Sequence, residues 1–492
     1  MIPHIPGDEF VIERKVRTRL LPVFPAERPP EARRFDFAEV LIGYDEATAP
    51  LEAARCLHCP DPAPCIQACP LHNDIPTALW FIEQGDFLRA AQVFRQTSFL
   101  SEICGRVCPP QTCRGSCTLS AYGKPINITK LEAFVADFQR RQGALPIHRA
   151  PPTGRRAAVV GSGPAGLTVA EFLARQGHSV TVFEAMPKPG GLLRYGIPAF
   201  KLPKAVIDQK VTDLEALGVQ FITGVRIGQD LTLDDLFAQG YQAIFLGVGT
   251  WRPVEPDWEG ANLEGVYMAL DFLMRANLPL EDLPPEKREP PRVGRRVAVI
   301  GGGDTAMDCA RTAIRLGAEE VTIYYRRSEA EMPGNREERK KAREEGVRFE
   351  FLVAPLRFLG EGGRLTAIEF VRMALGEPDE SGRRRPVPIP GSNFIVSVDA
   401  AVLALGFRAD PTIVRATPGL EASKGGLLRV DAEGRTSRPG VFAAGDGVTG
   451  PDLVVTASAA AMRAARAMHA YLMEQPPIEE FEAPALAEPV PA

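Results

Sequence analysis

The sequence predicts an α/β protein in which a helical, cysteine-rich N-terminal region precedes two nucleotide-binding units built on parallel sheets. Two observations support this prediction. A strand, glycine turn, helix and second strand follow one another twice, first from Ala157 and again from Arg295, and eight of the nine cysteines lie between Cys56 and Cys117. The 492 residues suffice for about three domains, and 45% hydrophobic with 24% charged residues is typical of a globular protein with a large core.

The first nucleotide unit ends at Glu184. Two apolar runs predict its strands, and Gly161, Gly163 and Gly166 between them form the pattern G-x-G-x-x-G. The three glycines permit a tight turn, close approach of the backbone to a pyrophosphate, and close packing of helix against strand. The carboxylate of Glu184 can accept hydrogen bonds from ribose hydroxyls. Because strand, turn, helix and acid are in register, the unit predicts a dinucleotide site rather than a glycine-rich surface turn.

Two further segments bear on the ligand of this unit, and the second of them favours FAD over NAD. Gly190 and Gly191 permit close approach of the backbone to a ligand, although an ordinary turn has the same composition. Far downstream, the apolar run 440–447 ends in glycine and Asp446, and a helix over 451–472 follows at once. A second strand–glycine–acid–helix element so distant in the chain suits a long ligand, with Asp446 at its ribityl or phosphate portion.

The second nucleotide unit repeats the same order of elements. Its turn contains Gly301 and Gly303, and Ala306 replaces the third glycine, which the pattern tolerates. Arg326 and Arg327 stand where the first unit has its acid. An acid there would repel a 2′-phosphate, whereas guanidinium groups can bind it with paired hydrogen bonds. The unit therefore predicts NADPH, with NADH second and two solvated loop arginines as the alternative.

The cysteines indicate a metal site. They are spaced C-x-x-C, then C-x-x-x-C-P, with a second group over 104–117, and helical periods in 75–99 and 118–150 surround them. Disulfides are disfavoured without a secretory signal, and zinc remains an alternative because C-x-x-C pairs also suit zinc. The C-P ending is typical of ferredoxins, in which that cysteine often serves the second cluster of a pair. The spacing therefore favours two [4Fe–4S] clusters.

The cysteine distribution also predicts an electron route. Residues 118–308 contain no cysteine, so a flavin in the first unit has no dithiol partner nearby. The cysteine-rich region is then the expected exit for its electrons, because a flavin accepts two electrons together and releases them singly. The remaining cysteine, Cys309, lies within a predicted helix and is expected to serve packing.

Charge and hydropathy exclude other classes of function. A net charge of −5 argues against nucleic-acid binding, and no window is apolar enough to span a membrane. The first ten residues lack the basic and apolar segments of a signal peptide, so we expect a cytoplasmic protein.

Several longer stretches are highly specific: GSGPAGL, KPGGLLRYGIP, GGGDTAMD, YYRRSEAEMP and AAGDGVTGPDLVVTA. With the cysteine groups, they make residues 50–474 resemble the small (β) subunit of NADPH-dependent glutamate synthase. The chain also resembles two relatives of that subunit: the N-terminal module of dihydropyrimidine dehydrogenase and the flavin subunit of NADH-dependent ferredoxin:NADP oxidoreductase. The resemblance implies that NADPH reduces FAD, and that electrons pass through two [4Fe–4S] clusters to a partner. That partner is either a large catalytic subunit that makes glutamate or a ferredoxin-like acceptor.

The resemblance also implies a fold, in which a helical double-cluster domain precedes two Rossmann-like domains and the NADPH domain is inserted in the FAD domain. The implied boundaries are 1–150 for the iron–sulfur domain, 151–260 and 403–474 for the FAD domain, 261–402 for the NADPH domain, and 475–492 for a flexible tail. Position-by-position matching implies that FAD is bound by Gly161, Gly163, Pro164, Ala165, Gly166, Glu184, Gly191, Leu192, Arg194, Gly445, Asp446 and Thr456, and NADPH by Gly301, Gly303, Asp304, Thr305, Arg326 and Arg327. The flavin carries the chemistry, so no catalytic side chain is expected.

The same matching implies two ligand sets for the metal. One cluster would take Cys56, Cys59, Cys65 and Cys117; the other would take Cys69, Cys108, Cys113 and Glu132, leaving Cys104 outside both. A zinc-stapled, non-catalytic nucleotide-binding scaffold is the alternative from another class. Residues 1–50 carry no motif, and the apolar run 400–406 is interpreted as the strand that returns the chain to the FAD domain.

Overall fold

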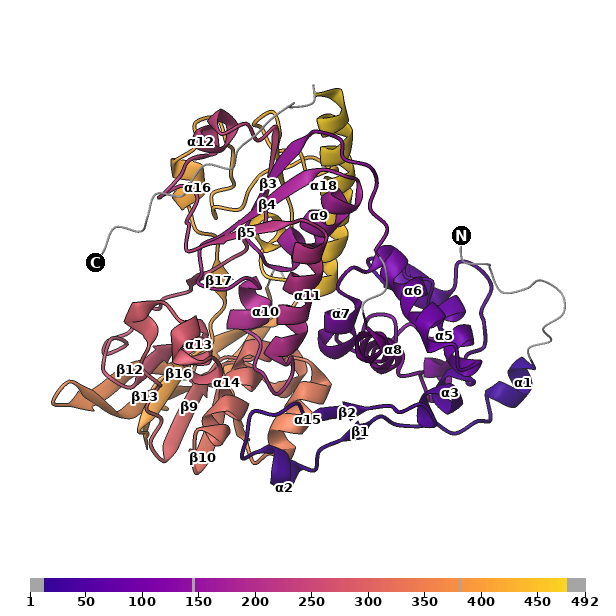
Figure 1. The fold of residues 1–492 in the computed structure, drawn as a ribbon. Coiled ribbons are helices and arrows are strands. Elements are labelled where there is room, and N and C mark those ends of the chain that lie inside the picture. The colour runs from indigo at the N-terminus through magenta and orange to yellow at the C-terminus, as the bar shows by residue number, and fades with distance from the viewer. Residues whose placement is uncertain (1–12, 144–146, 380–381, 476–492) are drawn as a thin grey trace.

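The computed structural model describes residues 13–143, 147–379 and 382–475. The first ten residues, on which the prediction about a signal peptide depends, lie outside these ranges. The predicted tail over 475–492 also lies outside them, except for its first residue. Figure 1 shows three parts. The first is a sheet packed with long helices, among them the C-terminal helix; a second sheet lies below this part, and a cluster of N-terminal helices lies to one side. No helix in the described ranges is long and apolar enough to cross a membrane.

The first sheet has five parallel strands in the order β18-β6-β3-β4-β5. Its strands form because their residues are apolar on both faces, and helices α9 and α18 cover one side. The predicted strand at 440–447 is confirmed as β18, although it lies some 200 residues beyond its neighbour β6. The bounds are β3 Arg156–Val160, β4 Ser179–Glu184, β5 Gln220–Thr223, β6 Ala243–Leu246, β18 Val441–Ala443, α9 Pro164–Arg175 and α18 Val454–Glu474.

The second sheet is also parallel, in the order β11-β10-β9-β16-β8. It corrects one prediction: Ala400–Leu403 forms β16, between β9 and β8, and does not belong to the first sheet. The prediction was wrong because buried parallel strands of both sheets are equally apolar. The chain returns only afterwards, through β17 (Phe407–Arg408), which pairs with the outgoing strand β7 (Arg252–Pro253). The other bounds are β8 Val266–Met268, β9 Arg296–Ile300, β10 Glu320–Tyr325 and β11 Arg348–Phe351.

An antiparallel excursion follows β11 before the chain enters β16. Its inward side chains, Phe358, Ile368 and Phe370, pack against the second sheet, where the rings of Phe370 and Tyr324 stack with centroids 4.3 Å apart. Its bounds are β12 Val353–Glu361, β13 Arg364–Pro378, β14 Arg384–Pro388 and β15 Phe394–Ser397.

The cysteine-rich region is helical, as predicted. Asp74 and Asp86 cap the helices α5 and α6 by accepting hydrogen bonds from backbone N–H groups of the first turn. Apolar residues of these helices and of the first sheet belong to one continuous hydrophobic core, whereas the second sheet has a core of its own. The bounds are α3 Thr48–Ala53, α4 Pro64–Ala68, α5 Ile75–Glu83, α6 Phe87–Thr97, α7 Ser101–Val107 and α8 Ile128–Gln142.

Residues 26–43, hereafter the N-terminal arm, leave the cysteine domain and reach the second nucleotide unit, where they lie beside α15 (Figure 1). The arm consists of β1 (Ala26–Glu27), α2 (Pro30–Arg33) and β2 (Leu41–Gly43). No sequence motif predicted this arm. The remaining helices are α1 Arg14–Arg17, α10 Gly191–Tyr195, α11 Lys204–Ala216, α12 Leu233–Ala238, α13 Ala269–Asn277, α14 Asp304–Arg315, α15 Arg336–Glu344, α16 Thr412–Arg415 and α17 Asp446–Thr449.

Candidate active site

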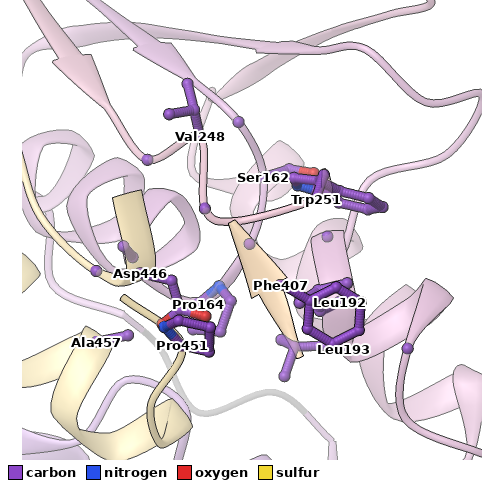
Figure 2. A pocket seen from close by; sticks show the side chains of 18 of the residues that line it. Ser162, Pro164, Leu192, Leu193, Val248, Trp251, Phe407, Asp446, Pro451 and Ala457 are labelled. Carbon is purple, nitrogen blue, oxygen red and sulfur yellow. The ribbon is translucent and has the colours of Figure 1, made fainter. Parts of the chain in front are cut away.

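A cavity of about 420 Å³, hereafter the main cavity because it adjoins both glycine turns, receives walls from all three parts of the molecule. The glycine turn before α9 and the end of β18 contribute one wall, and the first turns of α14 contribute another. Figure 2 shows Pro164 and Asp446 together on one side, with Leu192, Leu193 and Phe407 across from them. Cys108 of the cysteine domain also lines this space. The cavity therefore connects the regions that the sequence assigned to FAD, NADPH and metal.

The first glycine turn has the geometry that its pattern predicts. A Cβ atom on Gly166 would lie 1.9 Å from the carbonyl oxygen of Gly161, so helix and strand backbones are in direct contact there. Gly161 has a φ of +93°, and its Cβ would lie 2.5 Å from the oxygen of Gly247. Nothing lies within 4 Å of a Cβ on Gly163. Two glycines are thus required by the protein, and the third leaves room for a ligand.

Glu184 is fixed at the end of β4, where its side chain is 4% exposed. Its two carboxylate oxygens accept hydrogen bonds from the backbone N–H groups of Ser162 (3.0 Å) and Met186 (2.8 Å). The Ser162 hydroxyl also donates to it and accepts from the N–H of Gly190. Ser162 is a site residue that sequence reasoning missed, although it stands inside the glycine pattern.

The predicted residues after Glu184 divide into two groups. Gly191 and Leu192 line the cavity, and a Cβ on Gly191 would lie 2.6 Å from the Cα of Gly163. Arg194 is not among the described residues that line the cavity. Its guanidinium donates to the carbonyl of Pro189 at 2.6 Å and pairs with Asp208 at 2.5 Å. Arg194 therefore holds the loop in shape.

The C-terminal contribution divides in the same way. Gly445 has a φ of +79° and brings Asp446 to the start of α17, where it lines the cavity. Burial raises the pKa of Asp446 to about 6. Thr456 stands at the start of α18, outside the described cavity lining, and its hydroxyl donates to the carbonyl of Leu453 at 2.7 Å. Its neighbour Ala457 faces the cavity instead.

The second glycine turn repeats the first with one addition. A Cβ on Gly301 would lie 2.4 Å from the oxygen of Ala404, and Gly303 is open. Gly302, which the pattern does not specify, is also constrained, because its Cβ would lie 2.5 Å from the ring of Tyr325. Asp304 and Thr305, in the first turn of α14, line the main cavity.

Lys201 and Asp308, which sequence reasoning did not single out, also line this cavity, with Nζ and Oδ1 2.9 Å apart. Their ion pair connects the segment after α10 to α14 and thus joins the two nucleotide units.

The structure separates the two arginines that follow β10. Arg326 is exposed and has no hydrogen bond or ion pair with another residue of the described chain. Arg327 is 4% exposed: its Nη2 lies 2.6 Å from Asp379, and its Nε donates to the carbonyl of Arg384 at 2.7 Å. One guanidinium is therefore free to meet an anion, and the other already has a carboxylate partner.

The cysteines line two smaller cavities. The first is lined by Cys56, Cys59, Cys65 and Cys117, the set that the resemblance implies for one cluster. Burial raises the pKa of Cys65 to about 12, with a further contribution from Cys117, so a metal must displace protons to bind here.

The second cavity is lined by Cys69, Cys108, Cys113 and Glu132, the other implied set. Glu132 is 5% exposed, and its Oε1 has no hydrogen-bond partner within the described residues. A buried carboxylate with one unpartnered oxygen beside three thiols suits a metal centre that would use this oxygen. Cys104 lines the same cavity, so the structure places it next to this ligand set.

The three cavities adjoin one another in a row. Cys108 lines both the main cavity and the second cysteine cavity, and Ile128 lines both cysteine cavities. In the part of the chain that is described, no three His, Cys, Asp or Glu side chains converge on the position of a single metal ion. A [4Fe–4S] cluster spreads its ligands over four irons, so four side chains can surround it without converging.

Comparison with known proteins identifies the family. A family model described as pyridine nucleotide-disulphide oxidoreductase matches residues 155–461. The chain belongs to this family. A second model, described as dihydropyrimidine dehydrogenase domain II with a 4Fe-4S cluster, matches residues 33–144. The two matches together confirm the predictions of an oxidoreductase with a flavin, a nicotinamide nucleotide and a 4Fe–4S domain.

Individual relatives agree with this assignment. The chain is 43% identical to the glutamate synthase [NADPH] small chain of Halomonas elongata, over 88% of this chain and 93% of that one. It is equally identical to the oxidoreductase UacF of Escherichia coli, over 89% of this chain and 70% of that one. These likenesses confirm the resemblance to glutamate synthase small chains. The structure of Mycobacterium tuberculosis FprA in complex with NADPH shares the fold, with a TM-score of 0.55 at 23% identity over 66% of this chain and 85% of that chain.

Proposed function

We propose that this chain is the electron-input subunit of a glutamate-synthase-type enzyme, which takes reducing equivalents from NADPH and delivers them to a large catalytic chain. The main cavity carries the proposal, because its walls come from both nucleotide units and include Cys108 of the cysteine domain. A protein that only stored nucleotides would have no need of a cysteine at this junction.

The residues of the first unit suit FAD. The N-terminus of α9 and the open position at Gly163 would receive the diphosphate, and Glu184 would accept hydrogen bonds from the adenosine ribose. The apolar side chains of Leu192 and Phe407 would exclude water from the ring end of the cavity. When bound, FAD accepts two electrons together and releases them singly, which matches the one-electron capacity of an iron–sulfur cluster.

The residues of the second unit suit NADPH. The open position at Gly303 and the N-terminus of α14 would receive its diphosphate. Arg326 is the guanidinium that we assign to the 2′-phosphate, because it is exposed and unpartnered. Arg327 would join it only by leaving Asp379.

The cysteine domain suits two [4Fe–4S] clusters, one in each cysteine cavity. Four thiols would hold the first cluster, and three thiols with the carboxylate of Glu132 would hold the second. Cys108 belongs to the second set and also faces the main cavity, so the second cluster would lie nearer the flavin. The first cluster, whose ligand Cys59 is partly exposed, would then face the partner.

The test begins with anaerobically purified protein. We expect FAD, about eight irons and matching acid-labile sulfide per chain. NADPH should then reduce the flavin, and addition of a glutamate synthase large chain with 2-oxoglutarate and glutamine should reoxidise it and yield glutamate. Zinc without iron would establish the scaffold alternative. Reoxidation by ferredoxin but not by the large chain would assign the chain to a ferredoxin-linked enzyme.

A matched pair of variants tests the exit route. Cys108→Ala should leave reduction of the flavin by NADPH intact while removing iron and abolishing electron delivery to the partner. Cys309→Ala removes a buried thiol from the second nucleotide unit, away from the cysteine cavities, and should change neither property. Normal delivery by Cys108→Ala would disprove the route.

A further inference from the structure

The second cysteine cavity contains more polar groups than its four proposed ligands. Ser98 and Cys104 also line it, with exposures of 0% and 2%. The hydroxyl of Ser98 has no hydrogen-bond partner in the described chain. In the first cavity, by contrast, the wall between the cysteines is apolar except for Thr118. The two cavities therefore differ in the number of hydrogen-bond donors that face their contents.

Helix packing fixes where these donors point. Gly105 presses α7 against α8: its Cβ would lie 2.5 Å from the backbone nitrogen of Ala133 and 2.8 Å from the oxygen of Thr129. Cys104, beside Gly105, and Glu132, beside Ala133, are thereby brought to the same cavity. Cys104 and Cys108 are four residues apart in and just after α7, where the N–H of Cys108 donates to the carbonyl of Cys104 at 2.9 Å.

A centre in the second cavity has less solvent to stabilise added charge than one in the first. Cys69, Cys113 and Glu132 are each at most 7% exposed and only Cys108 is partly exposed, whereas three of the four cysteines around the first cavity are partly exposed. No described Lys or Arg lines the second cavity, and the nearby ammonium of Lys130 donates to the carbonyls of Gly105 and Arg106. Reduction adds one negative charge to a site that already contains a carboxylate. The protein must therefore stabilise that charge with neutral donors.

We propose that the Cys104 thiol and the Ser98 hydroxyl donate hydrogen bonds to the sulfur atoms of the second cluster and its ligand Cys108, and thereby raise the reduction potential of that cluster. Hydrogen bonds to cluster sulfur favour the more negative, reduced state. The two residues do not bind iron. They make the buried cluster next to the flavin reducible despite its carboxylate ligand. This inference rests on the two clusters of the proposed function.

The test is an anaerobic redox titration of the holoprotein monitored by electron paramagnetic resonance. Ser98→Ala and Cys104→Ala should each lower the potential of one cluster, by about 59 mV for a tenfold change in a one-electron equilibrium. The other cluster and the iron content should be unchanged. Cys104→Ser retains a donor and should keep the potential closer to wild type. The controls are Thr417→Ala and Cys309→Ala, since neither residue lines a cysteine cavity, both are buried, and the hydroxyl of Thr417 also has no partner in the described chain.

Three results would overturn the inference. Loss of iron in Cys104→Ala would show that Cys104 is a ligand. Unchanged potentials in both alanine variants would show that the two donors do not affect the cluster. Equal shifts in both clusters would indicate a general disturbance of the domain. Failure of the proposed function is seen separately, because wild-type protein without two clusters would reveal it before any variant is made.

Discussion

The two nucleotide units share one pattern but present their recognition groups differently. In the first unit, Glu184 is buried and held by two backbone N–H groups. In the second, Arg326 is exposed and has no partner in the described chain. A buried, pre-positioned acid suits a ligand that stays bound, whereas an exposed arginine suits one that must arrive and leave in every cycle. The difference separates a resident cofactor from an exchanging substrate.

The units also differ in how they join the cysteine domain. The first sheet shares a continuous hydrophobic core with the cysteine-domain helices. The second sheet has its own core and meets the N-terminal arm through charged groups. Apolar contacts respond weakly to pH, but ion pairs depend on it directly. Changes in each unit should therefore have different signatures.

The largest expected effect is that of Gly166→Ala. The added Cβ would lie 1.9 Å from the oxygen of Gly161, so α9 must move away from β3. We expect loss of flavin and a destabilisation of about 1–3 kcal/mol, measured by flavin content and thermal unfolding. Gly163→Ala, where the position is open, is the matched control and should keep the fold while weakening flavin binding. A flavin-replete Gly166→Ala protein of normal stability would contradict the packing argument.

The next effect separates the two arginines of the second unit. Arg326→Ala should weaken the use of NADPH by about 10–100-fold, corresponding to one charge-assisted contact of about 1.5–3 kcal/mol, and leave the rate with NADH unchanged. Arg327→Ala should lower thermal stability, since it leaves Asp379 without its buried partner, and change the NADPH preference much less. Steady-state diaphorase assays with both nucleotides measure this. The reverse assignment would follow if Arg327→Ala alone abolished the preference.

A smaller effect is expected at the anchored acid of the first unit. Glu184→Gln replaces one carboxylate oxygen by an NH2 group, which cannot accept a hydrogen bond. The side chain can then no longer accept from the N–H groups of both Ser162 and Met186. FAD affinity should fall by about tenfold, near the value of one hydrogen bond to a charged group. Fluorescence titration of the apoprotein with FAD measures the change. Unaltered affinity would show that Glu184 supports the turn and does not contact the ligand.

The smallest effect concerns pH and the arm. Arg33, 2% exposed, pairs with Glu345 and Glu344 at 2.9 and 2.8 Å, while Arg311 and Arg315 also bind Glu345. Burial alone would raise the pKa of Glu345, but hydrogen bonds from Arg311 and Arg315 lower it to about 2.

A lowered carboxylate pKa gives stability that is complete above the usual value of about 4.5 and is lost as the pH falls toward 2. Hydrogen exchange in the arm should therefore accelerate over that interval, before exchange in the core shared with the first sheet. Arg33→Met should accelerate exchange in the arm already at neutral pH, because it removes the arm's side of these ion pairs. Equal acceleration in both regions would contradict the distinction between the two joints.

Local patterns were enough to predict both nucleotide turns, because each turn depends on residues close in sequence. The cysteine sets join Cys56 to Cys117 and Cys69 to Glu132, and they were predicted from the family resemblance instead. The roles of Gly161 and Gly166 follow from a spacing of five residues. The interaction of Arg33 with Glu345, in contrast, spans 312 positions and no local signal marks it. Arg194 and Thr456 lie in matching motifs but use their side chains within the protein fold. A motif identifies a position, and only packing decides which way its side chain points.

The N-terminal arm has a mechanical consequence. Its Val40 N–H donates to the carbonyl of Phe200 at 2.9 Å, and Arg311 and Arg315 of the second unit lie over the same Phe200 ring at 4.6 and 3.9 Å. Phe200 is thus contacted by two separate parts of the chain, the arm at its backbone carbonyl and α14 at its ring. A rotation of the nicotinamide-binding part during turnover would have to break these contacts together. We therefore expect the nicotinamide-binding part to keep its position while electrons pass between the sites.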